Sequence, residues 1–420
     1  MIRRKIQLII LFSLLIPIFS CDKDEENWDL IANNTLITVM KDYYLWYDQL
    51  PSVRASNYNT PVELIEDLRV NPPDRWSYVT TKEEWDSYFN TGTYYGFGFG
   101  NAFDEDGNLW ILYVFKNSPL VEKGITRGWR IETIEGVTPT AENYSSLLGP
   151  NEPGITKTLG FVSPSGAHVV FTFSKAEITM NSVLFDSTYS FGSTKLGYMV
   201  LKSFVEPTIA ELDECFEKFK TEGINELVVD LRYNGGGLTD VANYLANLIG
   251  GQTASGNIFA TYFHNSKNTN LNGHTYFSTE TNSLSLDRVI FITSGSTASA
   301  SELVINGLKP FMPVILIGST THGKPVGMYA FRYKEFDWIF VPICFTIRNA
   351  LNEGDFYNGI GVNVQAADDY LRNFGDVYET SFNSCLTYLG VTITKGGKLT
   401  LPKKSKVITG RGLYEEIGAW

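Results

Sequence analysis

The feature that most constrains the fold is a set of short apolar runs in the second half of the chain. They cover residues 227–231, 289–292 and 314–317, and in each run apolar residues follow one another almost without interruption. Because side chains alternate between the two faces of a strand, such runs predict strands that are buried on both faces. Apolar helical segments at 241–248 and 302–308 separate them, which predicts an α/β core with crossover connections.

The first twenty residues have the pattern of an export signal. Arg3, Arg4 and Lys5 precede an apolar stretch that covers residues 6–19. That stretch is shorter than the ~20 apolar residues of a membrane span, and it fits the apolar region of a signal peptide. We therefore expect residues 1–20 to be a signal peptide; the alternative is a cytoplasmic start with a buried helix.

The apolar stretch ends in Ser20-Cys21, a small residue followed by cysteine, which resembles a bacterial lipobox. The resemblance implies that Cys21 is the lipidation site and that a lipid anchor attaches the protein to a membrane. The acidic run 22–26 resembles the surface-export signals of Bacteroidetes lipoproteins and forms a solvated tether. We expect a protein of the cell envelope, anchored in the outer membrane and facing the periplasm or the surface.

The composition argues against several classes of function. The net charge is −12, and such an acidic protein is a poor partner for a nucleic-acid backbone. The four histidines are scattered and no C-x-x-C spacing exists, so we expect no metal and no other cofactor. Three cysteines remain after Cys21, an odd number among apolar neighbours, which predicts buried thiols rather than a disulfide set. They are Cys215, Cys344 and Cys385.

The remainder of the chain divides into four parts. Residues 21–92 are read as a tether and a small helical domain, because their aromatic residues recur at helical spacing. Alternating strands dominate 93–177, the α/β core covers 178–388, and a tail occupies 389–420. Within the core, the polar stretch 264–287 is long for a connection, so we expect a lid or a mobile excursion there.

Two turns that follow buried strands carry residues that could take part in catalysis or ligand binding. The first, residues 230–237, ends in three glycines, whose bare N–H groups suit an oxyanion hole. It also suits a phosphate loop, but Leu238-Thr239 follows where that loop requires lysine and then serine or threonine. The second turn places Ser299 at the start of a helix, where its hydroxyl either caps the helix or acts as a nucleophile.

Lys324 follows the strand 314–317 and lies 25 residues beyond Ser299. Parallel neighbouring strands end at the same edge of a sheet, so the lysine loop is expected beside the Ser299 turn. A partly desolvated lysine can accept the serine proton as a general base. The alternatives are that Lys324 is a solvated loop charge, or that His322 is the base.

Taken together, these motifs resemble the C-terminal processing peptidases, also called tail-specific proteases, over about residues 28–388. Aromatic runs at 44–47 and 74–78 are similar to the lipoprotein branch of that family in Bacteroidetes. The resemblance implies a multidomain α/β protein, with a protease core related to the crotonase and Clp protease folds, a PDZ domain and a helical N-terminal domain. The motif residues are Asp230, Leu231, Arg232, Asn234, Gly236, Gly237, Ser299, Ala300, Ser301, Glu302, Gly323 and Lys324.

The family resemblance also implies the catalytic roles. Ser299 is the expected nucleophile, Lys324 the general base, and the N–H groups of Gly236 and Ala300 the oxyanion donors. Many relatives carry glutamine four residues after the lysine, where this chain has Met328, and glycine directly after it, where this chain has proline. What holds Lys324 is therefore an open question at this point.

The segment 93–176 resembles a PDZ domain. Gly96-Phe97-Gly98-Phe99 matches the loop whose backbone N–H groups bind the terminal carboxylate of a peptide that adds as a strand. The alternative is that these glycines only form a tight turn. We expect a serine endopeptidase that selects protein or peptide substrates by their C-termini. Two other functions are a catalytically silent, peptide-binding surface lipoprotein and a crotonase-like acyl-transfer enzyme.

Overall fold

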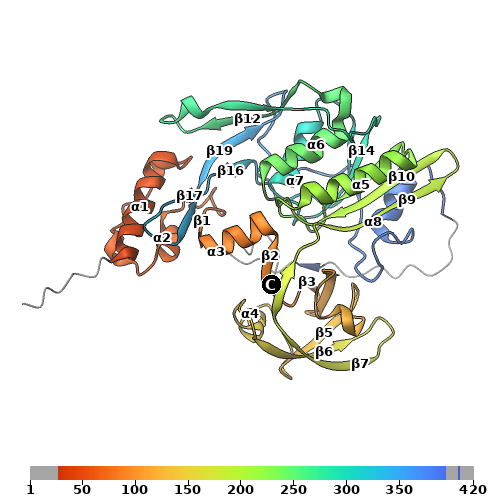
Figure 1. Cartoon of the computed structure of the whole chain (residues 1–420), viewed down its shortest axis with the longest axis horizontal. Helices are drawn as coiled ribbons and strands as arrows, with labels where there is room; N and C mark the ends of the chain where they lie inside the picture. Colours follow the sequence, from red (N-terminus) through yellow and green to blue (C-terminus); the bar gives the residue numbers. More distant parts are fainter. Residues whose placement is uncertain (1–26, 394–404, 407–420) are drawn as a thin grey trace, which may run out of the picture.

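The computed structural model describes residues 27–393 and 405–406. The expected signal peptide and Cys21 lie outside the described residues. The described chain forms an N-terminal helical region, a β-rich unit and an α/β core (Figure 1). Within the described residues, no helix combines the length and the apolar character that crossing a membrane requires.

The α/β core is built on a six-stranded sheet in the order β20-β15-β14-β11-β10-β9. All neighbouring pairs are parallel except β10 and β9, so the buried apolar runs form a parallel sheet as predicted. The two strands before and after the Ser299 turn, β14 and β15, are direct neighbours. The strands are β9 (Val183–Phe191), β10 (Thr194–Leu201), β11 (Glu226–Asp230), β14 (Val289–Thr293), β15 (Val314–Gly318) and β20 (Val364–Gln365).

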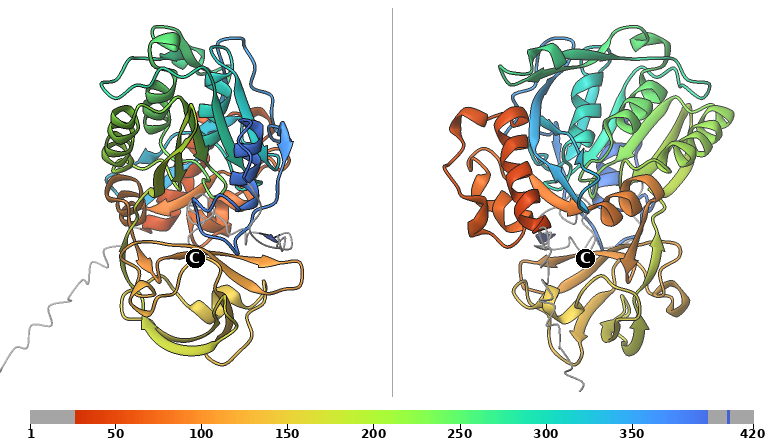
Figure 2. Two further views of the ribbon diagram at one scale, coloured as in Figure 1. Left: turned by 90° about the vertical axis from the view of Figure 1, so that its right-hand side faces the viewer. Right: turned by 60° about the vertical axis from the view of Figure 1, so that its left-hand side comes forward.

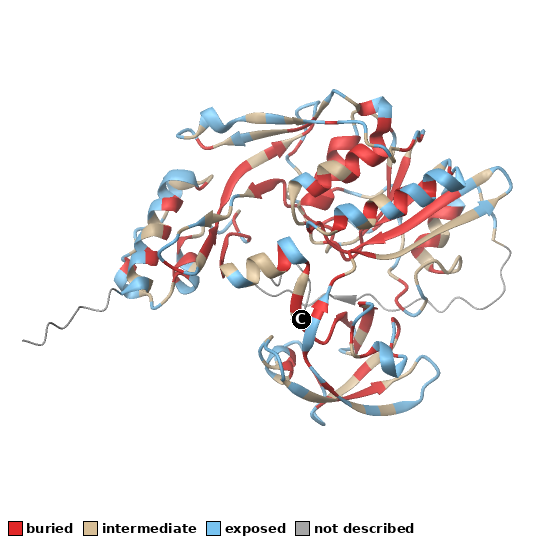
Figure 3. Cartoon of the chain, viewed as in Figure 1, coloured by how far each residue is buried: buried red, intermediate tan, exposed pale blue. Residues whose placement is uncertain are grey.

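Helices cover both faces of this sheet, so its central strands are largely buried, whereas the edge strands at its two ends are partly exposed (Figure 3). Val229 and Phe291 belong to one apolar cluster with α5 (Thr208–Glu222), α6 (Thr239–Ala254) and α7 (Ala300–Leu308). Their sequence neighbours Val228, Ile290 and Ile292 belong to a second cluster with α8 (Thr380–Tyr388). The alternation of side chains along each strand therefore supplies two cores from one apolar run.

A second sheet, in the order β13-β12-β19-β16, corrects the expectation of a lid at residues 264–287. The first part of this stretch is an antiparallel hairpin of β12 and β13. Its tip is tied to the N-terminal region, because the Asn265 side-chain amide donates to the carbonyls of Asp42 and Tyr44 at 3.0 and 2.9 Å. These strands are β12 (Ile258–His264), β13 (Gly273–Tyr276), β16 (Val326–Met328) and β19 (Ile343–Arg348).

The N-terminal region consists of short helices packed on a small sheet of β1, β18 and β17. Thr60 caps the second helix and a proline occupies the first turn of that helix, so the local sequence specifies where it begins. Apolar residues of both helices pack against the core strands β18 and β19, for example Met40 and Leu64 against Phe340 and Ile343. The elements are α1 (Trp28–Tyr43), α2 (Pro61–Leu68), β1 (Tyr78–Thr81), α3 (Lys82–Trp85), β17 (Phe331–Arg332) and β18 (Trp338–Val341).

The β-rich unit, residues 93–179, forms a lobe of its own below the core (Figure 2). Its first and last strands, β2 and β8, pair with each other, so the chain enters and leaves the lobe side by side. The intervening strands form an antiparallel sheet in the order β3-β4-β5-β6-β7 around an apolar cluster of their own. The elements are β2 (Thr93–Gly96), β3 (Phe99–Asp104), β4 (Leu109–Val114), β5 (Arg130–Ile134), α4 (Tyr144–Leu148), β6 (Thr156–Val162), β7 (His168–Ser174) and β8 (Ala176–Thr179).

Candidate active site

Ser299 occupies a strained turn at the start of α7. Its φ of 56° is a value that residues other than glycine rarely adopt. The side chain is half-buried, at the end of the turn that follows β14. Within the described part of the chain, the adjacent Ala300 N–H has no hydrogen-bond acceptor. A hydroxyl and a bare N–H group therefore meet at the N-terminus of a helix, where negative charge is stabilised.

The glycine-rich turn packs directly against Ser299. A Cβ atom on Gly236 would lie 2.8 Å from the Ser299 Cβ and 3.1 Å from the Ala300 nitrogen, and Gly236 has a φ of 113°, so only glycine fits. The turn is joined to the serine turn by the Asn234 carbonyl, which accepts from the Ala298 N–H at 3.1 Å and from the Ser301 hydroxyl at 3.0 Å. Both turns thus form one rigid unit.

Gly236 differs from the expectation in one respect. Its N–H donates to the side-chain oxygen Oδ1 of Asn234 at 2.9 Å. The structure therefore brings Gly236 to Ser299 but directs its N–H to an internal acceptor. Ala300 carries the bare donor beside Ser299 in this conformation.

Lys324 is buried, with 4% of its surface exposed, in the loop after β15. Its Nζ donates to the thioether sulfur of Met328 at 3.4 Å. The residue that replaces the usual glutamine thus still contacts the amine, although a thioether is a weaker acceptor than an amide oxygen. The sequence left the support of Lys324 open, and Met328 is part of the answer.

Glu302 connects the serine turn to the lysine loop. Its carboxylate is completely buried, and oxygen Oε2 accepts from the backbone N–H groups of both Ser299 and Lys324, at 3.0 and 2.8 Å. Oxygen Oε1 accepts from the Thr321 hydroxyl at 2.5 Å and the Gly323 N–H at 2.7 Å. Because two donors share Oε2, the backbone nitrogens of Ser299 and Lys324 lie within about 6 Å of each other.

Burial raises the pKa of the Glu302 carboxyl, and its four hydrogen-bond donors oppose that rise. The carboxylate therefore compensates for its lost hydration with backbone and hydroxyl dipoles rather than with a positive side chain. A single buried side chain in this way determines the spacing between the two loops.

His322 is placed as a structural residue. Its Nε2 accepts from the Trp76 indole at 3.2 Å, and Nδ1 lies 3.3 Å from the Gly295 carbonyl. Burial, with the nearby positive charges of Arg75 and Lys324, lowers its pKa to about 4. The ring is therefore neutral at pH 7, with both nitrogens engaged. This arrangement favours Lys324 over His322 as the base and joins the N-terminal region to the lysine loop.

A buried ionic network lies beneath the glycine-rich turn. The Arg232 guanidinium binds Asp230 at 2.5 Å, Glu379 at 2.7 Å and Asp368 at 3.1 Å. Arg127 of the β-rich unit also binds Asp368, at 2.9 Å. Although burial raises it, the two arginine charges hold the pKa of Asp368 below its ordinary value. The network joins three segments of the chain that are distant in sequence.

The four residues of the expected peptide-binding loop are all buried. Gly96 belongs to β2 and is paired with Ala176, and the Phe97 and Phe99 rings point into the core of the β-rich unit. Gly98 has a φ of 75°, and a Cβ there would lie 2.8 Å from the Ser118 Cβ. The Ser118 hydroxyl donates to the Phe97 carbonyl at 2.7 Å, which closes the loop. The loop leads directly into β3.

The sequence analysis missed the roles of several buried polar residues. Glu302 was recognised only as part of a motif, and Arg127, Thr321, Asp368 and Glu379 were not singled out. A signal for Glu302 was present, because an acidic residue three positions after a serine at a helix start is a capping pattern. The other partners become neighbours only through tertiary contacts, so no local pattern marks them.

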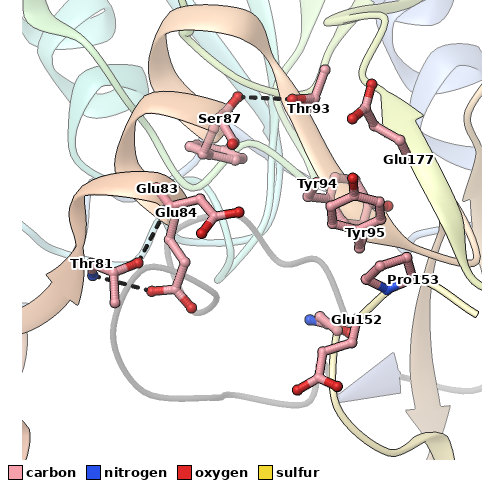
Figure 4. A pocket seen from close by; sticks show the side chains of 12 residues that line it. Thr81, Glu83, Glu84, Ser87, Thr93, Tyr94, Tyr95, Glu152, Pro153 and Glu177 are labelled. Carbon is pink, nitrogen blue, oxygen red and sulfur yellow. Dashed lines mark hydrogen bonds between the residues drawn. The ribbon is translucent and has the colours of Figure 1, made fainter. Parts of the chain in front are cut away.

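A separate pocket of about 380 Å³ lies between α3 and the β-rich unit (Figure 4). Neither Ser299 nor Lys324 lines it. Its walls carry four glutamates from three segments of the chain, so any ligand there faces a negative surface. The glutamates are Glu83, Glu84, Glu152 and Glu177.

Two family models match the chain in the regions that build this site. The model described as peptidase family S41 matches residues 195–362, and the peptidase S41 N-terminal domain matches residues 32–78. Together they match about half of the 420 residues. The first match includes the glycine-rich turn, the serine turn and the lysine loop.

Curated relatives include two carboxy-terminal processing proteases. CtpB of Bacillus subtilis is 25% identical over 307 residues, which is 72% of this chain and 59% of that protein. The carboxyl-terminal-processing protease of Synechocystis is 26% identical over 319 residues, which is 74% of this chain and 72% of that protein. The chain spans less than two thirds of the Bacillus protein.

Solved structures agree in fold. A Bacteroides fragilis structure assigned to the S41 proteases has a TM-score of 0.69 and 25% identity, and the match covers 85% of this chain and 97% of that one. The photosystem II D1 C-terminal processing protease has a TM-score of 0.51 at 18% identity, covers 80% and 92% of the two chains, and supports the fold alone. From both family models, these relatives and the shared architecture, the chain belongs to peptidase family S41.

Proposed function

We propose that this chain is a lipid-anchored serine endopeptidase of the cell envelope that cleaves proteins or peptides through an acyl-enzyme. Ser299 is the nucleophile, Lys324 the general base, and Ala300 and Gly236 supply the oxyanion donors. The observation that carries the proposal is the shared oxygen of Glu302, which holds the backbone of Ser299 and of Lys324 in one buried site. A strained serine and a buried lysine in such proximity form a nucleophile and base pair.

The reaction follows from the groups at the site. Lys324 takes the proton from Ser299 Oγ while Oγ bonds to the carbonyl carbon of the scissile peptide. The carbonyl oxygen becomes negative and is stabilised by the Ala300 N–H at the start of α7. When the intermediate collapses, the C–N bond breaks and Lys324 returns the proton to the leaving amine. Water then attacks the ester carbon and gives its proton to the same lysine; the ester C–O bond breaks, the acid product leaves and Lys324 returns the proton to Ser299 Oγ.

Gly236 joins the oxyanion site when its N–H is shared with, or released from, Asn234 Oδ1. A bound substrate oxygen with developing negative charge is a stronger acceptor than a neutral amide oxygen, which favours this exchange. The internal bond of Gly236 is also the observation that favours a second candidate, a catalytically silent lipoprotein that only binds peptides.

Substitutions at the pair test the catalytic proposal. Ser299→Ala and Lys324→Ala should each lower turnover of an unstructured protein substrate by at least ~10³-fold while melting near the wild type. His322→Gln is the matched control from the same loop and should cost less than ~10-fold, because His322 is engaged with Trp76 and Gly295. Near-normal turnover of Lys324→Ala would assign the base elsewhere. Absence of fluorophosphonate labelling at Ser299 in the wild type would support the silent lipoprotein.

Substrate choice is proposed to depend on the β-rich unit as a PDZ-like domain that binds C-termini. A carboxylate held by backbone N–H groups adds charge-assisted hydrogen bonds of about 1.5–3 kcal/mol each. An otherwise identical peptide with an amidated end should therefore bind roughly 10- to 100-fold more weakly. Gly98→Val should remove the difference, because its Cβ meets Ser118 and its φ disfavours a side chain. Equal binding of both peptides would leave the unit as a spacer or cover.

The membrane location is proposed from Cys21, the expected lipid attachment site at the end of the signal-like stretch. Labelled palmitate should enter the wild-type protein and not Cys21→Ala. Equal labelling of both proteins would contradict the anchor without affecting the catalytic proposal.

A further inference from the structure

The chain's own C-terminal tail pairs with the β-rich unit. Ser405–Lys406 forms strand β21, which lies antiparallel to β3 with Ser405 opposite Asp104 and Lys406 opposite Phe103 (Figure 1). The sheet order is β21-β3-β4-β5-β6-β7, so β21 covers the edge of β3 that faces away from β4. About three hundred residues of sequence separate the paired strands, so this contact is tertiary and not a local hairpin.

This is the edge on which the proposed peptide binding depends. β3 begins at Phe99, directly after the Gly96–Gly98 loop. From Ser405 to Lys406 the partner changes from Asp104 to Phe103, so the tail runs towards that loop. A peptide that adds to β3 and ends at the loop runs in the same direction. β21 therefore lies on the edge of β3 that a ligand strand would use and runs in the same direction, at the end of β3 farther from the loop.

The tail is not a terminal ligand in this register. A peptide that ends at Gly98 has about five residues beyond the one opposite Phe103, since antiparallel strands pair residue for residue. The sequence continues for 14 residues from Lys406 to Trp420. Ser405–Lys406 is thus an internal strand, whose pairing does not require its own terminal carboxylate.

Charge complementarity favours this occupant. Lys403 and Lys404 directly precede Ser405 in the sequence. Asp104, which lies opposite Ser405, is followed by Glu105 and Asp106 in the exposed turn between β3 and β4. The sequence next to β21 is therefore basic and the turn next to Asp104 is acidic, and attraction between such charges weakens as salt concentration rises.

We propose that the C-terminal tail is an internal competitor for the β3 edge, which a substrate C-terminus must displace. This inference rests on the proposed peptide-binding role of that edge. A tethered strand competes at an effective concentration set by its linker, so even weak pairing occupies the edge. An incoming C-terminus can displace it because a carboxylate at the glycine loop adds charge-assisted hydrogen bonds, roughly twice as strong as neutral ones. Segments that are internal to a substrate chain have no terminal carboxylate to displace the tail, so they would be poor substrates.

The test uses the Ser299→Ala chain, full-length and truncated after Ile393, so that cleavage does not interfere. The probe is a fluorescent peptide that copies residues 400–410. If the tail occupies the β3 edge in about nine-tenths of the molecules, the truncated chain should bind the probe about 10-fold more tightly than the full-length chain. Truncation should also accelerate hydrogen exchange of β3 amides. Equal probe affinity in the two chains, or unchanged β3 exchange, would overturn the proposal.

Matched charge variants of the full-length chain sharpen the result. The double variant Lys403→Glu/Lys404→Glu should reproduce the effect of truncation. The control is Lys395→Glu/Lys398→Glu, which makes the same charge change farther along the sequence from Ser405–Lys406 and should bind the probe like the unsubstituted full-length chain. Loss of β3 protection on dilution would show that the strand comes from a second copy and would overturn the internal form. Failure of the amidated-peptide experiment would contradict C-terminus recognition alone, because β3 exchange is measured without any peptide.

Discussion

The glycine-rich turn and the pair formed by the serine turn and the lysine loop rest on buried charges that are compensated in different ways. Beneath the glycine-rich turn, Arg232 is surrounded by three carboxylates, and Arg127 adds a second positive charge. Beneath the serine turn and the lysine loop, Glu302 receives only N–H and hydroxyl donors. The first region balances charge with charge, and the second balances one charge with dipoles.

The difference teaches what each region is suited to do. A network of full charges is costly to break, because each partner left behind is a buried, uncompensated ion. It therefore holds three distant segments together and supports the fold. A carboxylate that binds backbone N–H groups instead sets the path of the main chain, so Glu302 determines where the backbones of Ser299 and Lys324 lie. Arg232 and Glu302 both occupy motif positions, but Arg232 holds segments of the fold together and Glu302 sets the path of the main chain.

The largest expected effect is on the charge network. Arg232→Met should lower the free energy of unfolding by about 3–5 kcal/mol, because three carboxylates lose their shared cation. Urea unfolding measures the change. The control is Arg348→Met, which breaks a pair whose Asp355 side chain is 71% exposed and should cost less than about 1 kcal/mol. Similar losses in both variants would remove the distinction between a buried network and a surface pair.

Glu302→Gln tests the dipole-compensated region. The amide NH₂ cannot accept from the N–H groups that the carboxylate binds, so at least one buried donor loses its partner, at about 1–3 kcal/mol of stability. Turnover should fall more steeply than stability, by roughly 100-fold, since misplacing the pair by about 1 Å is costly. Thr321→Val removes one donor but keeps the carboxylate, and it should be milder on both measures. A stable variant with full activity would show that Glu302 does not position the pair.

The smallest expected effect on stability is at Lys202. This residue is a buried basic group, whereas Glu302 is a buried acidic one, so it tests the comparison from the other sign of charge. It lies with its Nζ 6.0 Å from the Tyr113 ring centre, and burial lowers its pKa to about 7. An exposed lysine has a pKa of roughly 10.4, so between about pH 7 and 10 the unfolded chain binds more protons and this group makes stability rise with pH. Lys202→Met should therefore gain about 1 kcal/mol or more at pH 7.

That gain should shrink towards pH 10, where Lys202 is neutral in the folded chain and increasingly neutral in the unfolded one. Urea midpoints of the two proteins at several pH values measure it. A gain that is independent of pH would attribute the effect to packing and not to the buried charge.

Much of the fold and of the candidate site could be predicted from the sequence wherever the signal is local. The apolar runs around Val229, Phe291 and Leu316 predicted buried parallel strands, and the structure confirms them. The end of a strand followed by serine and a helix located Ser299. The expectation of a lid or a mobile excursion at 264–287 was wrong for the first part of that stretch, because it forms an antiparallel hairpin and the Asn265 side chain binds backbone carbonyls of the N-terminal region.

The sequence by itself determined the elements and the residue types of the site, because strand burial, helix capping and glycine-dependent turns depend on neighbours along the chain. Only the tertiary structure decided the partners of the buried charges, the internal bond of Gly236, the contact of Met328 with Lys324 and the pairing of the tail with β3. These contacts join residues tens to hundreds of positions apart. Their energies depend on burial and orientation, and both arise only when the sheets and helices pack.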